Sequence, residues 1–225
     1  MTLLAIHRNQ LMRMLPMFVV LALAGCWGAQ QTSPDAPMAV GGLAPTAEDK
    51  DAGRVGVVPG LNLRSYPTIA VALFPVSDRL EDEGDRRFAA EMSAFLQTEL
   101  VRRLRESGLF QRVVNLTETD YAPAADGKIL LRLQGTITRL GRGSQAARYF
   151  AGGFGAGATR TQAEMQFVEA PAGRVVLVTA DRRIASVGFF GGSDRDHLRE
   201  SFDDMARDLV KFLVRLSSGE APRKD

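Results

Sequence analysis

The stretch Ile129-Leu130-Leu131-Arg132-Leu133-Gln134-Gly135-Thr136-Ile137-Thr138 has the clearest strand pattern in the chain. Four apolar residues alternate with four polar ones: Ile129, Leu131, Leu133 and Ile137 against Arg132, Gln134, Thr136 and Thr138. Because successive side chains of a strand point to opposite faces, we expect one face of this strand to be buried and the other solvated. The stretch therefore predicts a sheet with a hydrophobic core on one side.

The segments that follow continue this sheet. Residues 159–169 repeat the alternation, residues 170–173 have the composition of a turn, and residues 175–184 return as a further strand. The short connection predicts an antiparallel hairpin.

The segments before this stretch predict a strand–helix–strand unit. Residues 68–74 form a short, nearly continuous apolar run, as expected for a strand that is covered on both faces. A helix is expected over about residues 85–107, ended by Gly108, and a short strand at Val113-Val114. Apolar residues recur at every fourth position of this helix: Phe88, Met92, Leu96, Leu100 and Leu104. Since such crossovers are right-handed, the two strands are expected to be parallel.

A second amphipathic helix is expected over about residues 194–216, after a capping box formed by Ser193 and Asp196. The predicted fold class is therefore α/β (α+β), with a mixed sheet of about five strands and two long amphipathic helices. We assign it to a single domain over residues 66–216, followed by a polar tail over residues 217–225.

The N-terminus has the features of a secretory signal. Arg8 and Arg13 make its start positive, residues 15–23 are apolar, and Ala24-Gly25 are small. Leu23-Ala24-Gly25-Cys26 resembles the lipobox of bacterial lipoproteins. That resemblance implies a signal peptide over residues 1–25 and a Cys26 that carries fatty acyl chains such as palmitate and binds the membrane. The alternatives are an ordinary signal peptide, or a short buried helix with an inert cysteine.

Residues 26–65 are poor in periodicity and rich in small and polar residues. They are expected to form a flexible linker after the lipidated cysteine. Position 27 is Trp, not the Asp that resembles an inner-membrane retention signal. The expected location is therefore the cell envelope, at the periplasmic face of the outer membrane.

Composition excludes several classes of site. The chain of 225 residues has 28 Lys+Arg and 26 Asp+Glu. Removing residues 1–25 takes away two arginines and no acid, so the mature chain is neutral and shows no nucleic-acid footprint. In the mature chain, Cys26 is acylated and His197 is the only histidine. Disulfides, zinc sites and Ser-His-Asp triads therefore lack the side chains that they need. We therefore expect no enzyme activity, no cofactor and no metal.

Two glycine-rich segments contain aromatic residues. Gly152-Gly153-Phe154-Gly155-Ala156-Gly157 is preceded by Tyr149 and Phe150, and Phe189 and Phe190 lie between glycines 188 and 191. A phosphate loop would follow a strand and begin a helix, whereas these glycines precede a strand, so a structural bend is the simpler interpretation. If both segments lie at one end of the sheet, they would form a single apolar edge for a partner or a membrane.

An acidic cluster follows the first predicted strand: Asp78, Glu81, Asp82, Glu83 and Asp85. It lacks EF-hand spacing, and a solvated loop that also favours a helix N-terminus explains it. A surface or capping role is expected for His197, in the first turn of the last helix.

Several of these segments together resemble a family of bacterial lipoproteins with a DUF4410-type domain of unknown function. The resemblance rests on Ile69-Ala70-Val71 with Phe74, on 104–110, on 148–157, and on 164–169 with 173–176. Glu169 stands where that family often has Asp. The first half is also distantly similar to the α/β domain of curli-secretion (CsgG-type) lipoproteins, without their pore-forming hairpins. The resemblance implies a location and a fold, but no reaction.

The sequence thus leaves three hypotheses for function. The first is a non-catalytic envelope lipoprotein that acts as a scaffold or accessory protein of a complex, with a protein partner at the glycine-aromatic edge. The others are a periplasmic ligand-binding or hydrolytic domain that uses the acidic loop, and a subunit of a secretion assembly. The sequence leaves the oligomeric state open.

Overall fold

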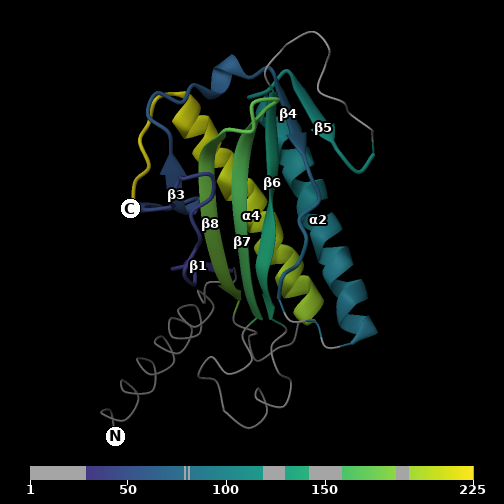
Figure 1. The fold of residues 1–225 in the computed structure, drawn as a ribbon. Helices are drawn as coiled ribbons and strands as arrows, with labels where there is room; N and C mark the ends of the chain where they lie inside the picture. The colour runs from purple at the N-terminus through teal and green to yellow at the C-terminus, as the bar shows by residue number, and fades with distance from the viewer. Residues whose placement is uncertain are drawn as a thin grey trace, which may run out of the picture.

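The computed structural model describes residues 29–78, 80, 82–118, 130–141, 159–185 and 193–224. These residues form one mixed sheet of eight strands, with two long helices packed on one of its faces (Figure 1). The strand order is β2-β3-β8-β7-β6-β4-β5, and β1 also pairs with β8. The predicted α/β class is confirmed, while the prediction of about five strands is too low.

The parallel part of the sheet follows the apolar pattern. β4 (Thr68–Val71) lies parallel to both β5 (Arg112–Asn115) and β6 (Leu130–Gly141). Helix α2 (Glu83–Ser107) joins β4 to β5. The stripe of α2 that faces the sheet is fully buried: Met92, Leu96, Leu100 and Leu104. Gly108 ends the helix at φ 64°, in the left-handed region that favours glycine.

The antiparallel part consists of β6, β7 (Thr159–Ala170) and β8 (Val175–Ala185). The predicted hairpin between β7 and β8 is confirmed. In the register, Gly141 lies opposite Arg160, and Thr159 lies opposite Ala185. The end of β6, the start of β7 and the end of β8 therefore lie together at one end of the sheet.

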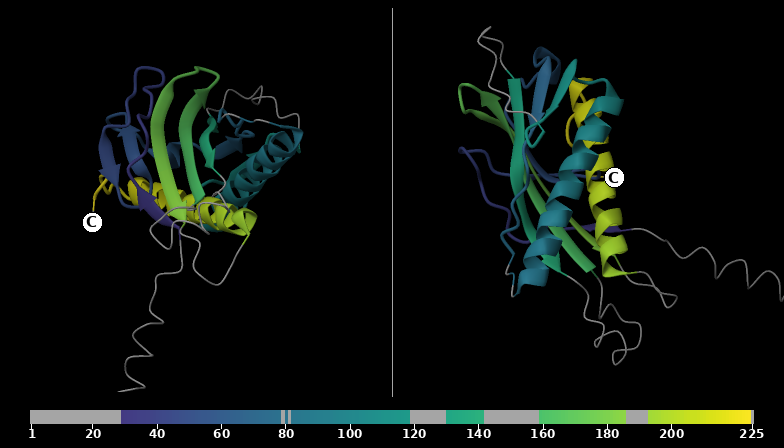
Figure 2. Two further views of the ribbon diagram at one scale, coloured as in Figure 1. Left: turned by 90° about the horizontal axis from the view of Figure 1, so that it is seen from below. Right: turned by 90° about the vertical axis from the view of Figure 1, so that its right-hand side faces the viewer.

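Helix α4 (Asp194–Ser217) begins with the predicted capping box. The Ser193 hydroxyl accepts a hydrogen bond from the Asp196 backbone N–H and donates one to the Asp196 carboxylate. α4 lies beside α2, and both cover the same face of the sheet (Figure 2). Four phenylalanines fill the space between the sheet and the helices: Phe74, Phe167, Phe202 and Phe212. No helix in the described parts of the chain is long and apolar enough to cross a bilayer.

The prediction of a flexible linker over residues 26–65 is wrong for the described part of this segment, residues 29–65. This part contains β1 (Gln30–Thr32), β2 (Ala47–Asp49), β3 (Gly53–Val57) and the 3-10 helix η1 (Leu63–Ser65). The segment buries too little apolar surface to fold alone. It folds here because β8 offers backbone partners to β1 and β3, and because the core accepts Val55 and Leu63, which are fully buried.

The residues after α4 also contact the sheet. The backbone N–H of Arg223 donates to the Asp49 carboxylate at 3.1 Å, and the Arg223 carbonyl accepts from the Lys50 N–H at 3.0 Å. The predicted polar tail therefore packs beside β2 as far as residue 224.

Candidate functional site

The residues predicted to bind the membrane or a partner lie outside the described residues: Cys26, Tyr149, Phe150, Phe154, Phe189 and Phe190. The strand ends that flank them are described. In the chain, residues 142–158 stand between β6 and β7, and residues 186–192 stand between β8 and α4. Because the flanking ends of β6, β7 and β8 are neighbours, both connections leave the sheet at the same end.

The acidic cluster after β4 has structural roles in its described residues. Asp82 is the N-cap of α2 and accepts a hydrogen bond from the Asp85 N–H at 2.8 Å. The Asp78 carboxylate accepts from the Leu140 N–H at 2.8 Å, which ties the loop to β6. Glu81 lies outside the described residues. Within the described residues, no group of three or more Asp, Glu, His or Cys side chains could hold a metal ion.

His197 lies in the first turn of α4, as predicted. Its backbone N–H donates to the Ser193 carbonyl, and its Nδ1 lies 3.8 Å from the Glu200 carboxylate. The side chain is 20% exposed. This arrangement fits the expected local role at the start of the helix.

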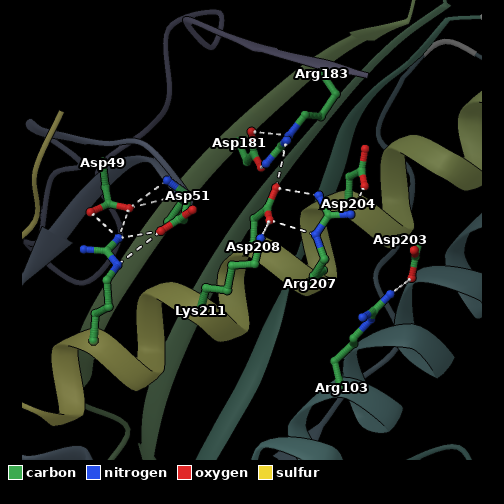
Figure 3. Close-up of polar contacts among 12 residues, drawn as sticks. Asp49, Asp51, Arg103, Asp181, Arg183, Asp203, Asp204, Arg207, Asp208 and Lys211 are labelled. Atoms are coloured by element: carbon green, nitrogen blue, oxygen red, sulfur yellow. Dashed lines mark hydrogen bonds and ion pairs between the residues drawn. The ribbon is translucent and has the colours of Figure 1, made fainter. Parts of the chain in front are cut away.

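A buried arginine joins the sheet to α4, a feature that the sequence analysis missed. Arg183 on β8 donates to the Asp181 carboxylate from Nη2 at 2.8 Å, and its Nη1 lies 3.1 Å from the Asp208 carboxylate on α4 (Figure 3). The Asp181 and Arg183 side chains are each 5% exposed. The two lie on the same face of β8 because strand side chains repeat every second residue.

The pKa values of the two acids beside Arg183 are shifted in opposite directions. Burial raises the pKa of Asp181, although the charge and hydrogen bonds of Arg183 oppose that effect. Burial also disfavours the charge on Asp208, but hydrogen bonds from Arg207 and Lys211 outweigh it and lower the Asp208 pKa. The Lys211 Nζ lies 2.8 Å from Asp208. Asp208 therefore stays ionised and holds the helix to the sheet through Arg183.

A second ion pair joins the end of α4 to the corner between β2 and β3. Arg215 Nη2 donates to the Asp49 and Asp51 carboxylates, each at 2.8 Å. The Asp49 side chain is fully buried and also accepts the N–H groups of Asp51 and Ala52. Asp49 thus holds together α4, the β2–β3 turn and the C-terminal residues.

A third polar cluster lies beside the β7–β8 turn. The Tyr66 hydroxyl donates to the Glu169 carboxylate, which also accepts from Arg174 at 2.7 and 2.8 Å. Burial, followed by the hydrogen bond and charge of Glu169, raises the pKa of Tyr66 to about 12. The hydrogen bond from Arg174 lowers the pKa of Glu169.

This cluster gives a prediction for alkaline pH. Because the folded pKa of Tyr66 lies above its ordinary value of 10.0, its contribution to stability is complete below pH 10.0 and is lost as the pH rises toward 12. We expect the difference in phenolate absorbance between the wild type and Tyr66→Phe to rise with a midpoint near pH 12. The absorbance is read after a rapid pH jump. Glu169→Gln should lower that midpoint. A wild-type difference curve centred near 10.0 would mean that the contact does not form.

A shallow polar pocket of about 200 Å³ opens between β1, β2, β3 and the C-terminal residues. Lys50, Arg54 and Lys224 line it, together with Glu48. The Lys224 Nζ lies 2.6 Å from the Glu48 carboxylate across the pocket. Its size and polarity fit a small polar molecule.

The fold can be compared with solved structures at low identity. The dodecameric PelC from Paraburkholderia phytofirmans is 14% identical, with 76% of this chain and 97% of that chain covered and a TM-score of 0.45. A DUF330 protein from Xanthomonas campestris is 12% identical, with 73% and 94% covered and a TM-score of 0.45. A minor lipoprotein from Acinetobacter baumannii is 15% identical, with 71% and 98% covered and a TM-score of 0.32. Similarities of this size carry no inference about function.

No curated protein matches the chain. The model of the domain of unknown function DUF4410 matches residues 69–188, which run from β4 to just beyond β8. This is more than half of the chain and includes the strand–helix–strand unit and the antiparallel hairpin. The family predicted from the sequence is thereby confirmed: the chain belongs to the DUF4410 family.

Proposed function

We propose that this protein is a lipid-anchored envelope lipoprotein with a non-catalytic role, as a scaffold or accessory protein of an envelope complex. The observation that carries the proposal is Leu23-Ala24-Gly25-Cys26 after a positive start and an apolar run. Trp27 in place of Asp favours the periplasmic face of the outer membrane.

The described charged groups support a structural rather than a catalytic role. Asp82 caps a helix, Asp49 and Asp208 join α4 to the sheet, and Glu169 holds Tyr66. Each of these carboxylates already has a partner within the fold. Within the acidic loop, Asp82 caps α2 and the Asp78 carboxylate accepts from the Leu140 N–H, which counts against the hydrolytic version of the second hypothesis, in which this loop would face a substrate.

The partner surface that we propose is the glycine-aromatic edge: Tyr149, Phe150, Phe154, Phe189 and Phe190. Its support is the common position of the flanking strand ends, because both connections leave the sheet beside each other. Aromatic side chains gathered at one end of a domain are typical of a protein interface.

The lipid anchor is tested by replacing Cys26 with serine in the full chain, expressed with its signal in a Gram-negative host. The wild type should take up a labelled fatty acid, lose residues 1–25 and sediment with the membrane. Cys26→Ser should take up no label and remain uncut, whereas the matched control Ala29→Ser should behave as the wild type. A wild-type chain without acyl label would contradict the proposal.

The partner edge is tested by crosslinking in intact cells. The triple variant Phe154→Ser, Phe189→Ser and Phe190→Ser should lose the crosslinked partner. Met38→Ser is the matched control, because Met38 is an exposed hydrophobic residue outside the edge, at 72% exposure. If the triple variant keeps every crosslink, the edge is not the partner surface.

The polar pocket favours one second candidate, a periplasmic domain that binds a small polar ligand. Native mass spectrometry of protein purified from its own envelope should then show a bound molecule that is lost in Arg54→Ala. A wild-type mass equal to that of the acylated chain alone would exclude this candidate.

A further inference from the structure

The distance between the proposed anchor and the folded domain is short. β1 begins at Gln30, only four residues after Cys26. Even a fully extended chain of four residues spans no more than about 14 Å. The central strands β6, β7 and β8 are much longer, since a strand of 12 residues such as β7 extends about 40 Å. A tether this short keeps its attachment point next to the membrane.

The register fixes which end of the domain carries the tether. β1 runs antiparallel to β8, with Gln30 opposite Ile184. Ala185, the last residue of β8, lies opposite Thr159, and Arg160 lies opposite Gly141. The chain therefore enters the sheet at the end where β6 and β8 finish and β7 starts. We call this the anchored end, and the β7–β8 turn at residues 171–174 marks the far end.

Both long helices start at the anchored end as well. The side chain of Ser93 in α2 donates to the Phe74 carbonyl and Gln97 donates to the Val71 carbonyl, so α2 runs opposite to β4. Along α4, Asp208 pairs with Arg183 near the end of β8 (Figure 3). At the other end of α4, the Ser217 carbonyl accepts from Arg64. The first turns of α2 and α4 therefore lie toward the anchored end of the domain.

We propose that the anchored end rests against the lipid surface, with the strands standing upright and the far end about 40 Å away from the bilayer. This inference rests on the proposed lipid anchor at Cys26 and adds an orientation to it. The occupant of the anchored end is the headgroup layer of the membrane, and the proposed partner of the glycine-aromatic edge would lie at that membrane surface. The β7–β8 turn, with Tyr66, Glu169 and Arg174, then faces away from the membrane.

Site-specific labels can test this orientation. Cys26 is the only cysteine, and acylation consumes its sulfur, so an introduced cysteine is a unique thiol. Arg160→Cys places an environment-insensitive fluorophore at the anchored end, and Ala172→Cys places it at the far end. Both residues are exposed. The purified acylated full-length variants are incorporated into phosphatidylethanolamine–phosphatidylglycerol vesicles that contain a headgroup nitroxide quencher.

We expect the label at position 160 to lose more than about half of its emission and the label at position 172 less than about a tenth, because about 40 Å separates the two ends. A second pair gives an independent reading if Arg160→Cys unfolds the protein. Glu83→Cys lies at the start of α2 and Ser218→Cys after the end of α4, and both residues are exposed. Equal quenching within both pairs, or stronger quenching at the far end, would overturn the orientation.

Failure of the lipid anchor and failure of the orientation would give different results. Vesicle flotation reports the anchor alone: a wild-type acylated chain that stays at the bottom of the gradient contradicts the lipid anchor. A chain that floats but shows equal or reversed quenching contradicts only the orientation. The soluble chain without residues 1–25 and with Cys26→Ser should show no quenching at either position.

Discussion

Replacing Arg183 by methionine is expected to lower the free energy of unfolding by about 3–5 kcal/mol, which would be measured as a lower urea midpoint with an unchanged slope. Arg183 is 4% exposed and faces two carboxylates. Without it, Asp181 has no cation beside it in a site from which water is excluded. The cost of an unpaired buried charge is therefore larger than the net value of the original pair.

Two further variants separate this explanation from a simple loss of packing. Arg182→Met removes the neighbouring arginine, which pairs with the half-exposed Asp35, and it should cost less than about 1 kcal/mol. Asp181→Leu combined with Arg183→Met removes both buried charges and should recover most of the lost stability. If the double variant is less stable than Arg183→Met alone, the unpaired charge is not the cause.

The effect of Arg183→Met should also depend on pH. The pKa of Asp181 is raised by burial, so without Arg183 the folded state binds the Asp181 proton more tightly than the unfolded state does. The resulting penalty is absent below the ordinary aspartate pKa of 3.8 and grows as the pH rises above it. We expect the stability difference between wild type and variant to narrow as the pH falls toward 3.8.

Asp49→Ala is expected to have the second-largest effect, a loss of about 3 kcal/mol. It leaves Arg215 with one carboxylate and removes the carboxylate that accepts hydrogen bonds from three backbone N–H groups. This loss of stability should come from the region around Asp49. Hydrogen exchange should increase first in β2, in β3 and in the residues after α4.

Glu48→Ala is the matched control for Asp49→Ala. It removes the adjacent acid of the same strand, which pairs with Lys224 at the surface. This variant should leave both the urea midpoint and the exchange rates of β3 close to those of the wild type. Equal exchange in the two variants would show that Asp49 does not hold the β2–β3 corner.

The elements with regular apolar periods could be predicted from the sequence to within a few residues. The apolar stripe of α2, the alternation in β6 and β7 and the capping serine of α4 can each be recognised from local sequence alone. For these elements the buried face is continuous, so the pattern in the sequence and the packing in the fold agree.

The first three strands could not be predicted in this way. β1 and β2 have three residues each. β1 and β3 pair with β8, which is distant in sequence, and Asp49 at the end of β2 pairs with Arg215 of α4. The buried Arg183 was missed for a related reason. A charged pair at alternate strand positions normally indicates a solvated face, and only the packing of α4 turns that face inward.

The pairing of the first strands with the last ones sets an order for folding. Asp49 binds Arg215 and the Arg223 N–H across 166 and 174 residues of chain, and β1 pairs with the end of β8. Contacts this distant in sequence form slowly, because a long loop must close before they contribute. β1 and β3 therefore lack their strand partner until β8, residues 175–185, is available. For the proposed lipoprotein, which would be exported from its N-terminus, the sheet would close only after β8 has crossed the membrane.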